Sequence, residues 1–325
     1  MCLDLLINAT VCFANINKDA LLWDYTHEKL PREHSSMKIR IGNLHRSMVM
    51  AIGLAAMSAY TSAATLKYNQ SESDPNGFYA EKMIKLALEH IDTKYELQIV
   101  PGSLTQVRMV EDAMNGSLDI IWAGTSKDLE EQLEPVRIPL YKGLLGHRFL
   151  IIRKGDQARF DGINTLEDLK KVKLGQGTAW VDTKILEANA LNVVKTMKYQ
   201  NLFFMLDGGR FDAFPRAVFE PFSEVASYPN LNLTVESRLM LVYKMDFYLF
   251  VNKNNKKLAR ELELGLNRAI QDGSFEKVFL SAKSVQEAIA KGDLKNRVVI
   301  PLDNPFNSKE TPIDRAELWI DPNSL

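Results

Sequence analysis

Segments with strand-like and helix-like patterns alternate along the chain from residue 66 onward, and this alternation constrains the fold more than any other feature. Residues 66–70, 95–100 and 118–121 have the character of strands and are bounded by turn-forming residues. Between them, apolar residues recur at helical spacing over 80–91, and a helix is predicted over 105–115. The order β-α-β-α-β predicts an α/β fold with a parallel sheet and right-handed crossovers.

A second alternating series occupies about residues 150–245 and predicts a second β-α-β unit. A further strand is expected over 247–251. Apolar residues at helical spacing then mark a long amphipathic helix over 258–270. A chain of this length has room for two lobes.

The third predicted strand ends in small residues, which is a favourable place for a ligand. The strand is followed by Ala123, Gly124, Thr125 and Ser126. Small residues let the backbone approach a ligand, and the two hydroxyl groups can hydrogen-bond it. In open α/β sheets, ligands bind at such carboxyl ends of strands. Thr125 and Ser126 are therefore candidate ligand contacts; the alternative is an ordinary strand-to-helix turn in which one of them caps the helix.

Residues 37–64 have the pattern of a Sec-type signal peptide. Basic residues follow Met37, an apolar core spans 48–60, and small residues end the segment, which predicts cleavage near Ala63 or Ala64. The alternatives are a short buried helix or a membrane anchor. We expect translation to start at Met37 and residues 1–36 to be a misassigned upstream segment.

Composition excludes several classes of function. The formal net charge of −1 leaves no basic footprint for nucleic acid. Both cysteines, Cys2 and Cys12, precede the predicted cleavage point, so the exported chain would lack a thiolate nucleophile or a cysteine metal site. Its two histidines, His90 and His147, have no carboxylate at a spacing typical of a metal site, and no nucleophile elbow or P-loop occurs. No catalytic residue, metal or cofactor is predicted.

Several short motifs, none specific alone, occur in an order and spacing that resemble a known family. They include Asn115-Gly-Ser-Leu-Asp-Ile-Ile-Trp-Ala-Gly124, Ile138-Pro-Leu-Tyr141, Thr165-Leu-Glu-Asp-Leu169, Gly175-Gln-Gly-Thr178 and Gly209-Arg-Phe-Asp-Ala213. Over residues 65–285, the sequence resembles the bacterial periplasmic solute-binding proteins of the amino-acid-binding class (family 3, type II).

The resemblance implies a two-lobed α/β fold in which each lobe is a mainly parallel sheet flanked by helices. Lobe 1 would comprise residues 65–148 and 250–325, and lobe 2 would be the inserted segment 149–249. Two strands, near 150 and 249, would form the hinge, and a small-molecule ligand would be captured by closure. The implied protein is a periplasmic monomer that serves an ABC-type permease. A sensor partner of a membrane receptor is one alternative, and a periplasmic enzyme on the same fold is another.

Two positions depart from the family pattern in ways that bear on the ligand. The place of the arginine that clamps an amino-acid carboxylate falls at about Glu130, and the place of the acidic residue that holds the ammonium group falls at Arg216. Both departures reverse the charge. They predict a ligand with an anionic or strongly accepting group rather than a free α-amino acid.

Six further residues are candidate ligand contacts, each with a structural alternative. Thr178, at a predicted helix N-terminus, could bind an anion or simply cap the helix. Arg216 could pair with the ligand or with Glu220 four residues on. Arg148, at the start of a hinge strand, could be a cleft charge or a surface charge. The aromatic candidates could stack on a ligand or pack in a core; they are Phe78, Trp122 and Trp180.

Overall fold

The computed structural model describes residues 63–71, 74, 76–321 and 324. The predicted upstream segment 1–36 and the signal peptide 37–64 lie outside the described residues, except for Ala63 and Ala64 at the predicted cleavage point. The first strand begins at Ala64. No helix within the described ranges is both long and apolar enough to cross a membrane.

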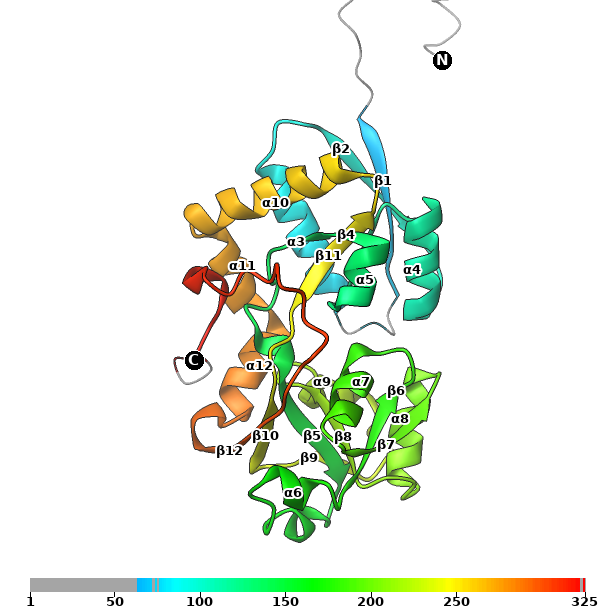
Figure 1. Cartoon of the computed structure of the whole chain (residues 1–325), viewed down its shortest axis with the longest axis vertical. Coiled ribbons are helices and arrows are strands. Elements are labelled where there is room, and N and C mark those ends of the chain that lie inside the picture. The colour runs from blue at the N-terminus through cyan, green and yellow to red at the C-terminus, as the bar shows by residue number, and fades with distance from the viewer. Residues whose placement is uncertain (1–62, 72–73, 75, 322–323, 325) are drawn as a thin grey trace, which may run out of the picture. The chain divides into compact units, whose positions relative to one another are not determined.

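Lobe 1 contains two small sheets covered by helices (Figure 1). Its elements in chain order are β1 (Ala64–Asn69), α3 (Gly77–Glu89), β2 (Tyr95–Val100), α4 (Gln106–Asn115), β3 (Ile120–Gly124), α5 (Lys127–Gln132), β4 (Leu133–Val136), β11 (Phe247–Asn252), α10 (Lys256–Gln271) and α11 (Ser274–Ser281). Strands β1 and β2 are parallel, as the β-α-β pattern predicts. Strand β3 follows on beside β1, where the Asp119 amide donates to the Lys67 carbonyl at 2.8 Å. Strand β11 runs antiparallel between β3 and β4.

Lobe 2 is organised on one larger sheet with the strand order β12-β10-β5-β8-β6-β7, and β9 pairs with β5 at its side. Its elements are η1 (Leu144–Gly146), β5 (His147–Arg153), η2 (Gln157–Arg159), α6 (Leu166–Leu169), β6 (Lys173–Gly177), α7 (Val181–Ala188), β7 (Asn192–Thr196), α8 (Tyr199–Asp207), β8 (Ala213–Ala217), α9 (Pro221–Ser227), β9 (Leu233–Val235) and β10 (Leu239–Val242). Strands β6, β7 and β8 are parallel, and β5 is antiparallel to β8. Each lobe is therefore an α/β unit: lobe 1 has one parallel and one antiparallel sheet, and lobe 2 has one mixed sheet.

The chain crosses between the lobes where β5 begins and again just before β11. These are the two positions expected for the hinge. The exact lobe boundaries, near 148 and 249, remain a prediction. A buried apolar core surrounds both crossings and includes Leu145, Phe149, Met245 and Leu249. At Gly146, a Cβ atom would lie 1.9 Å from the Tyr243 carbonyl oxygen, so the two crossing segments touch at a point where only glycine fits.

The C-terminal part of the chain differs from the expectation that residues 250–325 all belong to lobe 1. Helix α12 (Lys283–Lys291), η3 (Leu294–Asn296) and β12 (Val298–Pro301) come first, and β12 extends the lobe 2 sheet by pairing parallel with β10. The Arg297 guanidinium lies 3.7 Å from the Phe149 ring centre and donates to the Glu236 carbonyl oxygen at 2.7 Å. Side-chain packing against lobe 2 therefore decides where this segment lies.

The chain then returns to lobe 1. The Lys127 amide donates to the Phe306 carbonyl at 2.9 Å, and the Ile320 amide donates to the Lys142 carbonyl at 3.0 Å. The Trp319 ring covers Gly143, where a Cβ would lie 2.6 Å from it. The last short helix, η4 (Ala316–Leu318), belongs to this segment. The expectation that the C-terminal residues belong to lobe 1 thus holds for residues 304–320 but not for β12.

Candidate functional site

A cavity of about 520 Å³ is lined by residues of both lobes. Lobe 1 contributes the loop after β1, the N-terminal turn of α4 and the end of β3. Lobe 2 contributes the starts of β5, α7 and α8 and the end of β8. This volume is within the range of pockets that hold small organic ligands.

Two buried arginines of lobe 2 lie at the same end of two neighbouring strands of its sheet, because β8 ends where its antiparallel partner β5 begins. Arg148 is the second residue of β5 and pairs with Ala217, while Arg216 pairs with Phe149. Both guanidinium groups are almost fully buried, at 2% exposed for Arg148 and 6% for Arg216. Buried cations require partners, and three carboxylates supply them.

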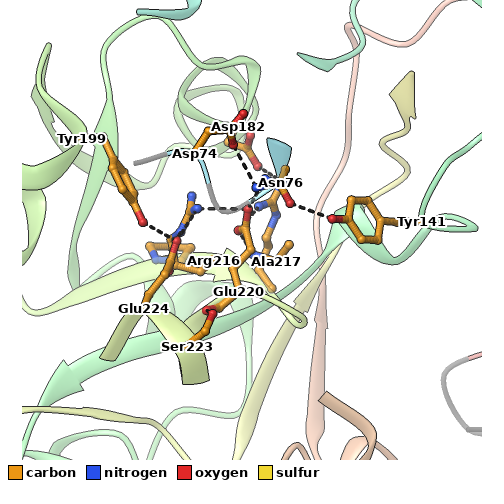
Figure 2. A network of polar contacts seen from close by, with 12 residues as sticks. Asp74, Asn76, Tyr141, Asp182, Tyr199, Arg216, Ala217, Glu220, Ser223 and Glu224 are labelled. Carbon is orange, nitrogen blue, oxygen red and sulfur yellow. Dashed lines mark hydrogen bonds and ion pairs between the residues drawn. The ribbon is translucent and has the colours of Figure 1, made fainter. Parts of the chain in front are cut away.

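Arg216 is paired with two of these carboxylates (Figure 2). Its Nε donates to both Glu224 oxygens at 2.9 Å, and its Nη2 lies 3.0 Å from Glu220 Oε1. Burial alone would lower the pKa of Arg216, but Glu220 and Glu224 hold it well above its ordinary value. Burial raises the pKa of Glu224, and Arg216 opposes that rise. Arg216 is therefore a permanent cation whose charge is met inside lobe 2.

Aromatic rings enclose the same arginine. The Arg216 guanidinium carbon lies 5.1 Å from the ring centre of Trp180, 5.4 Å from Tyr199 and 5.1 Å from Phe214, within the range of cation–π contacts. Trp180 can lie there because Gly177 has no side chain; a Cβ would be 2.6 Å from its ring. The Tyr199 hydroxyl donates to Glu224 at 2.6 Å.

Arg148 is paired less completely. Its Nη2 contacts Asp182 in the first turn of α7, and its Nη1 lies 3.8 Å from Glu220, which is too long for a hydrogen bond. Its Nε has no hydrogen-bond partner among the described residues. Arg148 is thus the buried cation of this site that retains an unsatisfied donor.

Among the described residues of the lobe 1 wall, Asp74 is the carboxylate that lines the cavity, and uncharged donors hold it. Asp74 Oδ2 accepts from Trp122 Nε1 at 2.7 Å, and Oδ1 accepts from the Asn76 amide at 2.9 Å. Burial raises the pKa of Asp74 above its ordinary value. The Asn76 side chain donates to Glu220 of lobe 2 at 3.0 Å and accepts from the Tyr141 hydroxyl at 2.9 Å, so it links the two walls (Figure 2).

Five of the eight residues predicted from the sequence line the cavity: Trp122, Arg148, Thr178, Trp180 and Arg216. The alternative role of Arg216, pairing with Glu220, is the one that the structure shows. Thr178 is exposed but does not cap α7, because that helix begins at Val181 and Trp180 is its N-cap residue.

The other three predicted residues lie away from the cavity lining. Thr125 is fully buried, and its hydroxyl donates to Glu130 at 2.7 Å. Ser126 is the N-cap of α5, where its hydroxyl accepts from the Leu129 amide. Phe78 is 58% exposed in the first turn of α3. Ser126 thus has the capping role given as its alternative, Thr125 is buried in the turn before α5, and Phe78 neither lines the cavity nor packs in a core.

Sequence reasoning did not identify most of the carboxylates of the site. Asp74 accepts from Trp122, 48 positions away, and Asp182 accepts from Tyr243, 61 positions away. No local sequence pattern therefore marks either carboxylate. Glu224 lies eight positions after Arg216, beyond the four-residue spacing of neighbours on one helix. Among the described residues, no group of three or more His, Cys, Asp or Glu side chains is arranged to hold a metal ion.

No protein-family model matches the chain, and no curated protein matches it in sequence. Solved structures do match in fold. An ancestral arginine-binding protein bound to glutamine has a TM-score of 0.53 at 18% identity and covers 69% of this chain and 99% of its own. An amino acid ABC transporter substrate-binding protein from Streptococcus pneumoniae bound to L-arginine has a TM-score of 0.52 at 14% identity, with 69% and 96% covered.

A histidine kinase sensor domain with similarity to periplasmic binding proteins matches as well. Its TM-score is 0.51 at 15% identity, and the match covers 66% of this chain and 93% of the sensor domain. At such identities the similarity establishes fold alone. The chain has the two-lobed type II fold of periplasmic binding proteins.

Proposed function

We propose that this chain is a periplasmic solute-binding protein, which captures a small polar metabolite between its lobes and delivers it to an ABC-type transporter. The observation that carries the proposal is a cavity of about 520 Å³ lined by both lobes, with a buried arginine that has an unsatisfied donor. The fold matches, which include a transporter substrate-binding protein, support it. Binding rather than catalysis is proposed; turnover of a bound compound would contradict this.

The proposed ligand has an anionic or strongly accepting group, and Arg148 is the residue that would hold it. The earlier reason for such a group, repulsion of a ligand ammonium by Arg216, does not hold because Glu220 and Glu224 neutralise Arg216. Arg148 instead has a buried Nε–H with no partner among the described residues, and its side chain lines the same cavity as the exposed Thr178. A hydrogen bond to a charged donor contributes about 1.5–3 kcal/mol.

Capture is proposed to occur by hinge closure of a monomer. Rotation at the two passages near β5 and β11 can leave the sheets of each lobe intact. The C-terminal segment, which passes to lobe 2 at β12 and then back to lobe 1, must follow this rotation. Small-angle scattering of the purified full chain should show a smaller radius of gyration once a ligand is bound. An unchanged radius at saturation would point to a rigid scaffold.

Export through the signal peptide at 37–64 is part of the same proposal. Fractionation of cells that produce the native chain should place the protein in the periplasm with its N-terminus near residue 64. A full-length form in the cytoplasm, or any peptide from residues 1–36 in the native precursor, would contradict it.

A second candidate function is the sensing of the same ligand for a membrane receptor. The match to a histidine kinase sensor domain favours it. A neighbouring permease gene would support transport, whereas a neighbouring receptor kinase or cyclase gene would support sensing.

Thermal-shift screening of the purified full chain against small metabolites tests the binding proposal. A ligand that binds only the folded state stabilises it by about 2.7 kcal/mol at a hundredfold excess over Kd. Hits should be enriched in carboxylates, phosphates and amides, and Arg148→Lys should weaken them because it removes the Nε donor. A hit set consisting of simple amines would contradict the assignment of an accepting group.

A further inference from the structure

The cavity has a charged, buried part and an apolar, exposed part. Arg148, Asp182 and Glu220 are between 2% and 7% exposed and form the buried part. The other part contains Val107 on α4 of lobe 1 and Met197 just before α8 of lobe 2, which are 42% and 64% exposed and line the same cavity.

Partly buried apolar side chains stand beside these two. Leu104 and Met109 of lobe 1 pack against the core formed by Ile121, Ala123 and their neighbours, and both also line the cavity. On the lobe 2 side, the half-buried Trp180 ring lines the cavity as well. Apolar side chains thus stand at the opening on both lobes, among exposed polar residues such as Ser103, Thr105, Lys198 and Gln200, whereas the interior is ionic.

Exposed apolar side chains on both walls of one cavity are unfavourable in water unless something covers them. Full burial of a Val or Met side chain is worth about 1.5–3 kcal/mol, and apolar surface rimmed by polar residues marks ligand grooves. Methionine adapts its shape to what it contacts. A ligand that filled only the ionic interior would leave this apolar surface wet.

We propose that the ligand has two chemically distinct parts: an accepting head group bound at Arg148, and an apolar tail of several carbon atoms that Val107 and Met197 cover from opposite lobes. This inference rests on the proposed binding function and adds the class of compound. The cavity volume of about 520 Å³ leaves room for a tail beyond a head group of a few atoms. Substituted organic acids and amides with alkyl or aryl chains fit this description.

A homologous series of probes tests the tail. Acetate, butyrate, hexanoate and phenylacetate keep one head group and lengthen the apolar part, and the matching primary amides do the same without the charge. Titration calorimetry on the full chain should show affinity rising about two- to fourfold for each added methylene, as expected for buried CH₂ groups. A difference between the two series identifies an anionic or a neutral head.

Matched variants locate the effect. Met197→Gln and Val107→Thr keep side-chain size while making it polar, and each should reduce the gain per methylene. Met114→Gln is the control, because Met114 is a similarly exposed methionine, at 48%, that does not line the cavity. It should bind the whole series as the unmodified chain does.

The outcomes separate this inference from the proposed function. If the short probes bind and longer tails add nothing, the two-part ligand is wrong while the binding function stands. If tail length matters equally in Met197→Gln, Val107→Thr and the unmodified chain, the tail does not lie at this opening and the inference is overturned. If no probe of either series binds, the accepting head at Arg148 fails, and the proposed ligand class fails with it.

Discussion

The carboxylates of the two lobes have different partners around the cleft. In lobe 2, Asp182, Glu220 and Glu224 each contact an arginine guanidinium. On the lobe 1 side, Asp74 and Asp246 accept hydrogen bonds from uncharged groups, Asp74 from an indole and an amide and Asp246 from the Tyr248 hydroxyl at 2.7 Å.

This difference in partners affects how readily each buried carboxylate is protonated. A guanidinium keeps a buried carboxylate ionised, and losing it leaves an uncompensated charge. A carboxylate held by neutral donors is easier to protonate. Burial raises the pKa of Asp74 and Asp246, and it raises the pKa of Glu224 as well, but there the Arg216 guanidinium opposes the rise. We infer that the lobe 2 wall is a preformed ionic unit, while the charge on the lobe 1 side depends on pH.

The largest effect is expected from removing Arg216. Arg216→Ala removes the guanidinium that Glu224 contacts and leaves Glu220 with the Arg148 guanidinium at 3.8 Å; the two glutamates are buried, at 4% and 3% exposed. The change should lower the free energy of unfolding by about 3–5 kcal/mol, which urea unfolding at neutral pH measures. The loss should shrink at acid pH, because burial raises the pKa of Glu224.

Arg159→Ala is the matched control. Arg159 also contacts two carboxylates, Asp156 and Asp212, but its side chain is 52% exposed, so its removal should cost at most about 1 kcal/mol. Equal losses for Arg216→Ala and Arg159→Ala would show that the lobe 2 pairs are not a special unit.

Asp246 tests the other side of the comparison through pH. It is 1% exposed, and its Oδ1 has no partner among the described residues. Burial, opposed by the Tyr248 hydrogen bond and assisted by the Glu130 charge, raises its pKa from 3.8 to about 7. Because the folded state holds this proton more tightly than the unfolded chain, stability should fall as the pH rises from about 4 to 7, by up to about 4 kcal/mol.

Asp246→Asn removes this titration while keeping an acceptor for Tyr248. Unfolding free energies of the two proteins should agree near pH 4 and diverge progressively between pH 4 and 7, with the asparagine variant the more stable. Parallel pH profiles would mean that Asp246 titrates normally and that the contrast between the lobes is wrong at this position.

Local patterns predicted the elements better than their pairing. The helix predicted over 105–115 is followed by Gly116, and the structure ends α4 there at φ 81°, a left-handed conformation that suits glycine. The capping of α6 by Thr165, with Asp168 three residues on, follows from a local motif in the same way. The pairing of β12 with β10 joins residues nearly sixty positions apart, and no periodicity encodes it.

The same distinction between local patterns and long-range contacts applies to the residues of the site. Trp122, Trp180 and Arg148 could be selected because each lies at the end of a predicted strand or the start of a predicted helix. Whether an arginine is free or paired depends on long-range contacts, as the Asn76–Glu220 hydrogen bond across 144 positions illustrates. That information arises only when the lobes are assembled.

A moderate effect is expected from the bridge between the walls. Asn76→Ala removes the hydrogen bonds to Glu220 and from Tyr141, and it removes no helix cap, since the Asn76 side chain makes no capping bond in α3. We expect a loss of about 1–2 kcal/mol in stability and a more open average conformation in scattering. Lys184→Ala, which breaks the exposed pair with Asp128 of lobe 1, should change both measurements less. A larger effect of Lys184→Ala would place the link between the lobes at the surface.

The smallest effect is expected at Phe78, which the family resemblance placed near the ligand. Phe78 is 58% exposed and lies outside the cavity lining, and an exposed side chain on a helix surface contributes little to stability. Phe78→Ala should therefore leave the free energy of unfolding within about 0.5 kcal/mol and ligand affinity within about twofold. Trp122→Phe is the informative partner, because it deletes the donor that Asp74 accepts at 2.7 Å in the same lobe. That change should shift the pH dependence of binding, since an Asp74 without the indole donor ionises less readily. If Phe78→Ala weakens binding as strongly as Trp122→Phe, ligand contact on the lobe 1 side extends to the first turn of α3, beyond the wall formed by Asp74, Asn76 and Trp122.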